Sequence, residues 1–124
     1  MFVNMLWEGI DKRSFPRAKY KCMVKITDHG QEEIFDTFTE NIGGGGVCVV
    51  LGKEIDLFKT ANLDLYLSDE KTPITCRGTI VWAIRRRLGN RKDDCEYDTG
   101  IEFIDISDND RARITELVSD ILSA

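Results

Sequence analysis

Apolar and polar residues alternate along most of the chain, as they do in half-buried β-strands. Residues 18–27 place Tyr20, Cys22, Val24 and Ile26 on one face and lysines on the other. In residues 33–42 apolar side chains fall on both faces, so the pattern does not fix which face points inward. The further strands that we expect are 46–51, 62–67, 74–87 and 95–106.

The C-terminal segment has a different period. Ser107 is followed three residues later by Asp110, which fits a helix-capping box with Asp in place of Glu. An apolar stripe with helical spacing follows, formed by Ile114, Leu117, Val118, Ile121 and Leu122. Short strands separated by turns, and then one amphipathic helix, predict a small antiparallel barrel with the helix over an opening or an outer face.

Composition narrows the function classes. The chain has 124 residues, 42% hydrophobic and 31% charged, which suits one domain with one core. Its net charge of −5 argues against general binding to nucleic acid or to anionic membranes. The four cysteines form no C-x-x-C pair and His29 is the only histidine, so we expect buried thiols in a reducing cytoplasm and no zinc site.

Two stretches suggest ligand chemistry. The run Gly43–Gly46 matches neither a P-loop nor a dinucleotide fingerprint, which leaves a turn with left-handed glycines or a binding loop. Before it lies a local basic cluster, in which Pro16 disfavours a helix and keeps the chain extended. Arg13 and Arg17 would then face the same side, up to about 13 Å apart. Two guanidinium groups so placed can grip two phosphates, or a phosphate and a guanine edge, although a solvated basic arm is the plainer alternative.

Together these stretches resemble the PilZ domain family. Its R-x-x-x-R pattern is matched by Arg13–Arg17, and its [DN]-x-S-x-x-G pattern by Asn41–Gly46, with Gly43 in place of the serine. The segments GTIVWA and TGIEFIDIS resemble later strands of the family, so the likeness covers residues 12–122. The resemblance implies a six-stranded antiparallel β-barrel plus a C-terminal α-helix over residues 12–124, after an N-terminal arm at 1–11. It also implies cyclic di-GMP as the ligand, with no cofactor and no metal.

The resemblance assigns ligand-binding roles to eight residues. Arg13 and Arg17 would contact phosphate and the guanine O6/N7 edge, and Lys12 would add a cation. Asn41 would accept hydrogen bonds from a guanine. The other four are Gly43 and Gly46, which would let the ligand approach the loop, Trp82 as a stacking wall and Arg85 as a lip residue. For Trp82 a place in the barrel core is the favoured alternative.

These features predict a cytoplasmic sensor rather than an enzyme. It would bind cyclic di-GMP and relay the signal to an unidentified protein effector, without binding nucleic acid polymers or inserting into membranes. The alternative is a degenerate PilZ module that binds no nucleotide and acts by protein contact in pilus or flagellar machinery. If the backbone at Gly43 tolerates a side chain, Gly43→Ser should restore the hydroxyl and strengthen binding.

Overall fold

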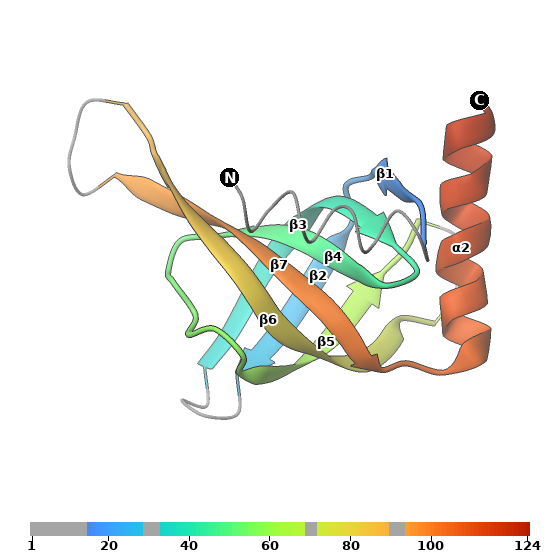
Figure 1. Ribbon diagram of the computed structural model, residues 1–124, viewed down its shortest axis with the longest axis horizontal. Helices are drawn as coiled ribbons and strands as arrows, with labels where there is room; N and C mark the ends of the chain where they lie inside the picture. Colours follow the sequence, from blue (N-terminus) through green and yellow to red (C-terminus); the bar gives the residue numbers. More distant parts are fainter. Residues whose placement is uncertain (1–14, 29–32, 69–71, 90–93) are drawn as a thin grey trace.

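A computed structural model gives the fold and describes residues 15–28, 33–68, 72–89 and 94–124. Strands and one helix follow each other along the chain (Figure 1). Their bounds are β1 Arg17–Lys19, β2 Met23–Asp28, β3 Glu33–Gly43, β4 Gly46–Leu51, β5 Thr60–Tyr66, β6 Ile74–Arg87, β7 Cys95–Asp105 and α2 Asp108–Ser123. The expected arm at 1–11, Lys12, Arg13 and part of the hairpin tip between β6 and β7 lie outside the described residues.

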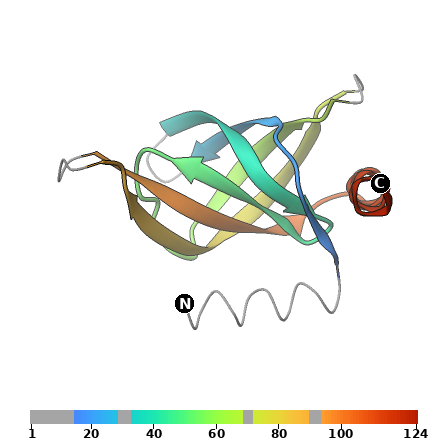
Figure 2. The same ribbon diagram turned by 90° about the horizontal axis from the view of Figure 1, so that it is seen from above.

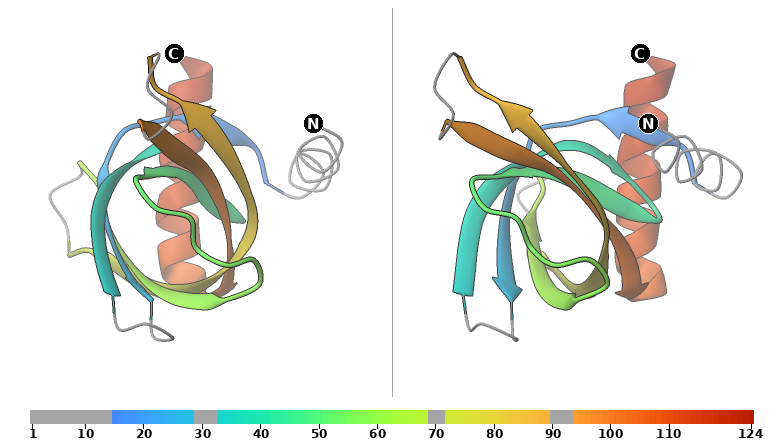
Figure 3. Two further views of the ribbon diagram at one scale, coloured as in Figure 1. Left: turned by 90° about the vertical axis from the view of Figure 1, so that its left-hand side faces the viewer. Right: turned by 60° about the vertical axis from the view of Figure 1, so that its left-hand side comes forward.

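Six of the strands close into a barrel. They are hydrogen-bonded in the order β3-β2-β5-β6-β7-β4, and β4 pairs back with β3 to complete the ring. Figure 3 looks along this ring, with α2 behind its far end. The three-residue strand β1 adds to the end of β3 as a seventh strand. The prediction of a six-stranded antiparallel barrel with a C-terminal helix is confirmed.

The single strand expected at 18–27 is two strands, β1 and β2. Both pair with β3, but β3 bulges at Glu40, which has no opposite residue in β4 and lies where the register changes. The buried Thr39 hydroxyl spans the break, since it donates to the Tyr20 carbonyl at 2.6 Å and accepts from the Cys22 amide at 3.0 Å. The alternation read from the sequence therefore holds, while the strand is interrupted.

Pairing with β2 settles which face of β3 is inward. Phe35 lies opposite Ile26 and Thr37 opposite Val24, and both partners are fully buried. Ile34 and Phe38 consequently point outward and are 58% and 49% exposed. The core is built mainly from aliphatic side chains that are 0% exposed, among them Val24, Ile26, Ile42, Val47, Val49, Leu63, Leu65, Ile74, Ile80 and Ile101.

Helix α2 covers one end of the barrel, beside β1 and the β3–β4 turn (Figure 2). Ser107 is its N-cap, as predicted, and accepts a hydrogen bond from the Asp110 amide at 3.1 Å. Ile114 and Val118 are fully buried in the barrel core. Leu122 was wrongly included in the buried stripe, because the last turn of α2 extends past β1 (Figure 1) and leaves it 57% exposed.

The β6–β7 hairpin projects beyond the barrel (Figure 1), and Ile84 on it is 39% exposed. Among the described residues, no helix has the length and hydropathy needed to cross a membrane.

Candidate functional site

Strand register brings most of the predicted site onto one outer surface of the barrel. Residues opposite each other in paired strands point to the same side, and here one row crosses five strands. The row consists of Lys19, Asn41, Cys48, Gly100 and Trp82 on β1, β3, β4, β7 and β6. We call the surface centred on this row the candidate face.

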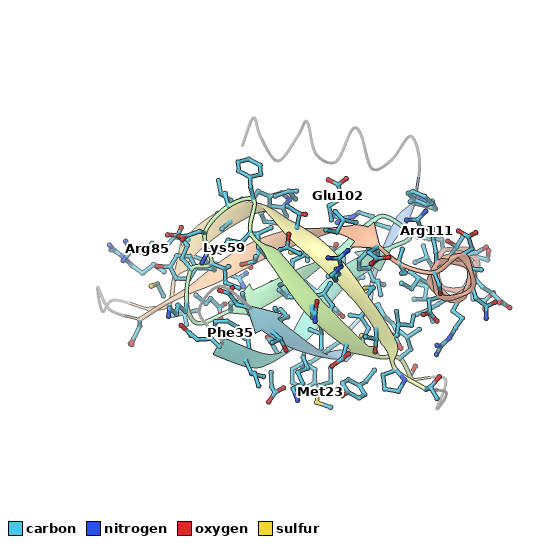
Figure 4. The ribbon with its side chains drawn as sticks, turned by 90° about the horizontal axis from the view of Figure 1, so that it is seen from below. Met23, Phe35, Lys59, Arg85, Glu102 and Arg111 are labelled. Atoms are coloured by element: carbon cyan, nitrogen blue, oxygen red, sulfur yellow. The ribbon has the colours of Figure 1, made fainter. Side chains whose placement is uncertain are left out.

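A second row of the candidate face runs beside the first. It consists of Arg17, Gly43, Gly46, Glu102 and Thr79. The intervening residues Ala18, Ile42 and Val47 are buried in the core, so the two rows face outward. Figure 4 shows Glu102 pointing out from the barrel. Five of the eight predicted residues thus share one face: Arg17, Asn41, Gly43, Gly46 and Trp82.

Arg85 is not among them. It lies opposite Tyr97, whereas its neighbour Arg86 lies opposite Glu96 and shares the side of Trp82. Arg85 therefore points to the other side of the hairpin, well away from Arg111 of α2 (Figure 4). The register slips by one residue between Ile80 and Trp82, and this bulge decides which arginine belongs to the candidate face.

Arg86 is held by three carboxylates at one border of the face. Its guanidinium lies 3.3 Å from Glu40, 2.7 Å from Glu96 and 3.2 Å from Asp98. Burial raises the pKa of the Glu40 carboxyl, and the neighbouring Asp98 raises it further. The cations Arg17 and Lys19 lie on β1, so the face has a basic side and an opposite side where Arg86 offsets carboxylates.

The glycines of the run are required by close contacts within the chain. At Gly43, Gly44 and Gly46 the backbone is not left-handed, so the expected positive φ is wrong for these three. A Cβ on Gly43 would lie 2.7 Å from the Pro16 carbonyl oxygen, and one on Gly46 would clash with the Ile101 carbonyl oxygen. Neighbouring main chain fills the space that a Cβ would enter at these two glycines, so the backbone at Gly43 does not readily admit a side chain. Ligand contact at either glycine stays a prediction.

Gly100 and Trp82 form the floor of the face. A Cβ on Gly100 would overlap the Trp82 indole, so the ring lies directly against the glycine backbone. Trp82 is only 7% exposed, yet it lies on the outer side of the barrel and not in its interior. It is therefore a floor residue and not the barrel-core aromatic that the sequence favoured, and its stacking on a ligand stays a prediction.

Cys48 lies in the middle of this floor and is 3% exposed. Burial raises the pKa of its thiol to about 12, with Glu40 and Asp98 raising it further and Arg17 and Arg86 lowering it. All four charges thus act on the same floor residue. The thiol remains protonated at neutral pH, and the centre of the face is uncharged.

Asn41 offers an unused acceptor. Its side-chain oxygen Oδ1 is buried and has no hydrogen-bond partner among the described residues. A buried acceptor without a donor is costly, because the group has lost its water. Asn41 also lines a groove of about 920 Å³ that adjoins the candidate face at Lys19.

Comparisons with known proteins identify the family. The PilZ domain profile matches residues 11–120. The chain belongs to the PilZ domain family. No curated protein sequence matches the chain.

Solved structures share this PilZ fold. The PilZ domain of YcgR from Escherichia coli, solved with c-di-GMP, has a TM-score of 0.70 at 9% identity and covers 90% of this chain and 92% of its own. The Bacillus subtilis inhibitor of motility MotI/DgrA has a TM-score of 0.69 at 21% identity over 87% of this chain and 50% of its own. The K. pneumonia MrkH–c-di-GMP complex has a TM-score of 0.68 at 17% identity over 90% of this chain and 52% of its own. The chain thus spans about half the length of MotI/DgrA and MrkH.

Sequence reasoning about this PilZ domain missed Cys48, Gly100 and Arg86. Gly100 could have been found from its place in TGIEF beside the family's strand ending in Trp82. Arg86 could have been found from strand alternation, since it lies four residues after Trp82; what the sequence does not show is the bulge before Trp82 that turns both side chains outward. Within the described part of the chain, His, Cys, Asp and Glu form no group of three that could hold a metal ion.

Proposed function

We propose that this PilZ domain is a receptor for cyclic di-GMP and that the ligand lies on the candidate face. The observation that carries the proposal is the strand register, which gathers Arg17, Asn41 and Trp82 on one surface. The YcgR PilZ domain, which was solved with c-di-GMP, has the same fold and supports this choice of ligand.

Each polar group has a partner in the proposed complex. Arg17, together with Arg13, binds phosphate and the O6/N7 edge of a guanine, because the guanidinium fork matches two adjacent acceptors. Asn41 Oδ1 accepts from guanine N1–H and N2–H₂, which would satisfy the buried acceptor. Lys12 and Lys19 add positive charge near the phosphates.

Apolar residues and Arg86 complete the proposed complex. Trp82 and Gly100 give a flat floor under the ligand. Arg86 takes the lip role that the sequence assigned to Arg85, because it shares the side of Trp82. Gly43 and Gly46 contribute by holding β1 and β7 close to the loop, and direct ligand contact at either glycine remains a prediction.

The proposed role is that of a cytoplasmic sensor, not of an enzyme. Ligand on the candidate face would bridge β1 to the barrel and change the surface offered to a protein effector. This relay does not require the domain to bind a nucleic acid polymer or to enter a membrane.

Calorimetric titration with cyclic di-GMP tests the proposal. We expect Arg17→Ala to lose about 2 kcal/mol, roughly 30-fold in Kd, because a charge-assisted contact is removed. Arg77→Ala is the matched control, since Arg77 is an exposed arginine paired with Asp105 and lies outside both rows of the candidate face. No heat with the wild-type protein at high ligand concentration would overturn the proposal.

A second candidate is an adaptor that binds no nucleotide. The contact between Gly43 and the Pro16 carbonyl favours it, because the place of the family's serine side chain is taken by main chain. This candidate predicts that the wild-type protein and Arg17→Ala give the same flat titration.

A further inference from the structure

The groove beside the candidate face is built from four separate parts of the chain. Its walls come from the end of β1 and the following link at Lys19 and Lys21, from β3 at Phe38, from the end of β4 at Val50, and from the β6–β7 hairpin at Leu88 and Glu96. Its volume of about 920 Å³ is enough for several side chains of another molecule.

An exposed apolar row continues the groove along the outside of the barrel. Met23 lies opposite both Phe38 and Tyr66, so the three side chains form one row across β3, β2 and β5. They are 46%, 49% and 38% exposed, and Figure 4 shows Met23 pointing away from the barrel. Leu88, on the opposite wall of the groove, is 44% exposed. Apolar side chains gathered in this way are typical of a protein-binding surface.

One wall of the groove offers positive charge to a partner. Among the described residues Lys19 and Lys21 form no ion pair, and the Lys21 ammonium lies 4.8 Å from the centre of the Phe38 ring. The carboxylates on the other side, Glu40 and Glu96, are both held by Arg86. In a chain with a net charge of −5, this wall is a local basic site next to an apolar one.

The basic wall is fixed to the barrel in advance. Besides the two bonds of Thr39, the Tyr20 amide donates to the Glu40 carbonyl at 3.2 Å. The Ser68 amide donates to the Tyr20 hydroxyl at 2.8 Å. The link between β1 and β2 is therefore held at both sides, and docking does not need to order it.

We propose that this groove and the apolar row dock a segment of a partner protein that carries a large apolar side chain next to carboxylates. The apolar side chain enters beside Phe38 and Leu88, and the carboxylates pair with Lys19 and Lys21. Lys19 belongs both to the groove and to the candidate face. The groove could therefore serve as the surface through which the ligand signal reaches a partner, and this part of the docking proposal rests on the proposed function. The fixed wall means that docking can be measured without nucleotide.

The probe is a display library of random 16-residue peptides, selected against the full chain without nucleotide. The expected result is enrichment of sequences with a Phe, Leu or Trp flanked by Asp or Glu. Binding of a selected peptide, measured by fluorescence anisotropy, should weaken at least tenfold in Phe38→Ser and in Lys21→Glu. Ile34→Ser is the matched control, because Ile34 is an equally exposed apolar residue of β3 outside the groove, and it should bind as the wild type does.

Several results would overturn the docking proposal. They are no enrichment, enrichment of basic or uncharged sequences, and equal binding to Phe38→Ser and the wild type. Phe38-dependent dimers in sedimentation would mean that the surface binds a second copy instead. Calorimetry with cyclic di-GMP keeps the two proposals apart. In the wild-type protein, nucleotide binding without peptide binding contradicts only the docking, and peptide binding without nucleotide binding contradicts only the receptor role. Phe38→Ser should lose the peptide and keep the nucleotide.

Discussion

At the residue scale, Gly43 shows how a motif position can be shaped by packing. The Pro16 carbonyl oxygen lies 2.7 Å from the position that a Cβ on Gly43 would take. We predict that Gly43→Ser displaces β1, lowers the free energy of unfolding by about 1–3 kcal/mol, and weakens cyclic di-GMP binding because Arg17 moves. Gly52→Ser is the control, since nothing lies within 4 Å of a Cβ there. Thermal melting and calorimetry on both variants check this, and a Gly43→Ser protein of unchanged stability that binds more tightly would restore the expectation drawn from the sequence.

Two neighbouring arginines point to opposite faces of the β6–β7 hairpin. Arg86 lies on the candidate face and Arg85 on the opposite side. We predict that Arg86→Gln weakens cyclic di-GMP binding about tenfold or more, because its three carboxylates lose their counter-charge and repel the phosphates. Arg85→Gln should bind like the wild type. The Kd of each variant for cyclic di-GMP tests this prediction. Weaker binding by Arg85→Gln than by Arg86→Gln would show that the two arginines have been assigned to the wrong faces.

The sequence shows which residues belong to the site better than it shows on which side of a strand each of them lies. Arg17 and Asn41 could be chosen from the two motifs that resemble the PilZ family. The outward side of Trp82 and Arg86 could not, because one extra residue at the bulge before Trp82 turns every later side chain over. The close contacts at Gly43, Gly46 and Gly100 are made by segments far apart in the chain, and no local pattern records them.

At the element scale, α2 contributes to stability most through its two fully buried side chains. Ile114 and Val118 are 0% exposed, while Leu122 in the same stripe is 57% exposed. We predict that Ile114→Ala lowers the free energy of unfolding by about 2–5 kcal/mol and Leu122→Ala by less than about 0.5 kcal/mol. Urea unfolding of the two variants measures the difference, and equal losses would mean that α2 does not close the barrel.

The strands and the helix were predictable because apolar residues repeat with different periods in them, about every two residues in the strands and about every 3.6 residues in α2. The capping box gave the start of the helix to the residue. The division of 18–27 into β1 and β2 was not predictable. It follows from the bulge at Glu40 in the partner strand, and the alternation of 18–27 itself carries no sign of it.

At the scale of the whole molecule, buried thiols make stability depend on alkaline pH. Burial raises the pKa of Cys48 and Cys76 to about 12, from an ordinary value near 9.0. Above about pH 9 the unfolded chain releases protons that the folded chain keeps, so stability is complete below this pH and falls as the pH rises toward 12. The slope is up to about 1.4 kcal/mol per pH unit for each thiol.

The double variant Cys48→Ala/Cys76→Ala isolates this contribution. Urea unfolding between about pH 8 and 10.5 should show a shallower decline for the variant than for the wild type, since both proteins share all other titrating groups. Parallel curves would show that the two thiols keep their ordinary pKa in the folded protein.

The central claim is that cyclic di-GMP lies on the candidate face, and amide NMR with the ligand tests it most directly. The floor and its neighbours should report binding first, so we expect the largest shift changes at the Asn41, Cys48 and Gly100 amides and at the Trp82 indole N–H. The amide chemical shifts of residues on the opposite side of the barrel, such as Lys25 and Asp64, should not change. Shift changes centred on that opposite side, with the Trp82 indole unmoved, would contradict the claim.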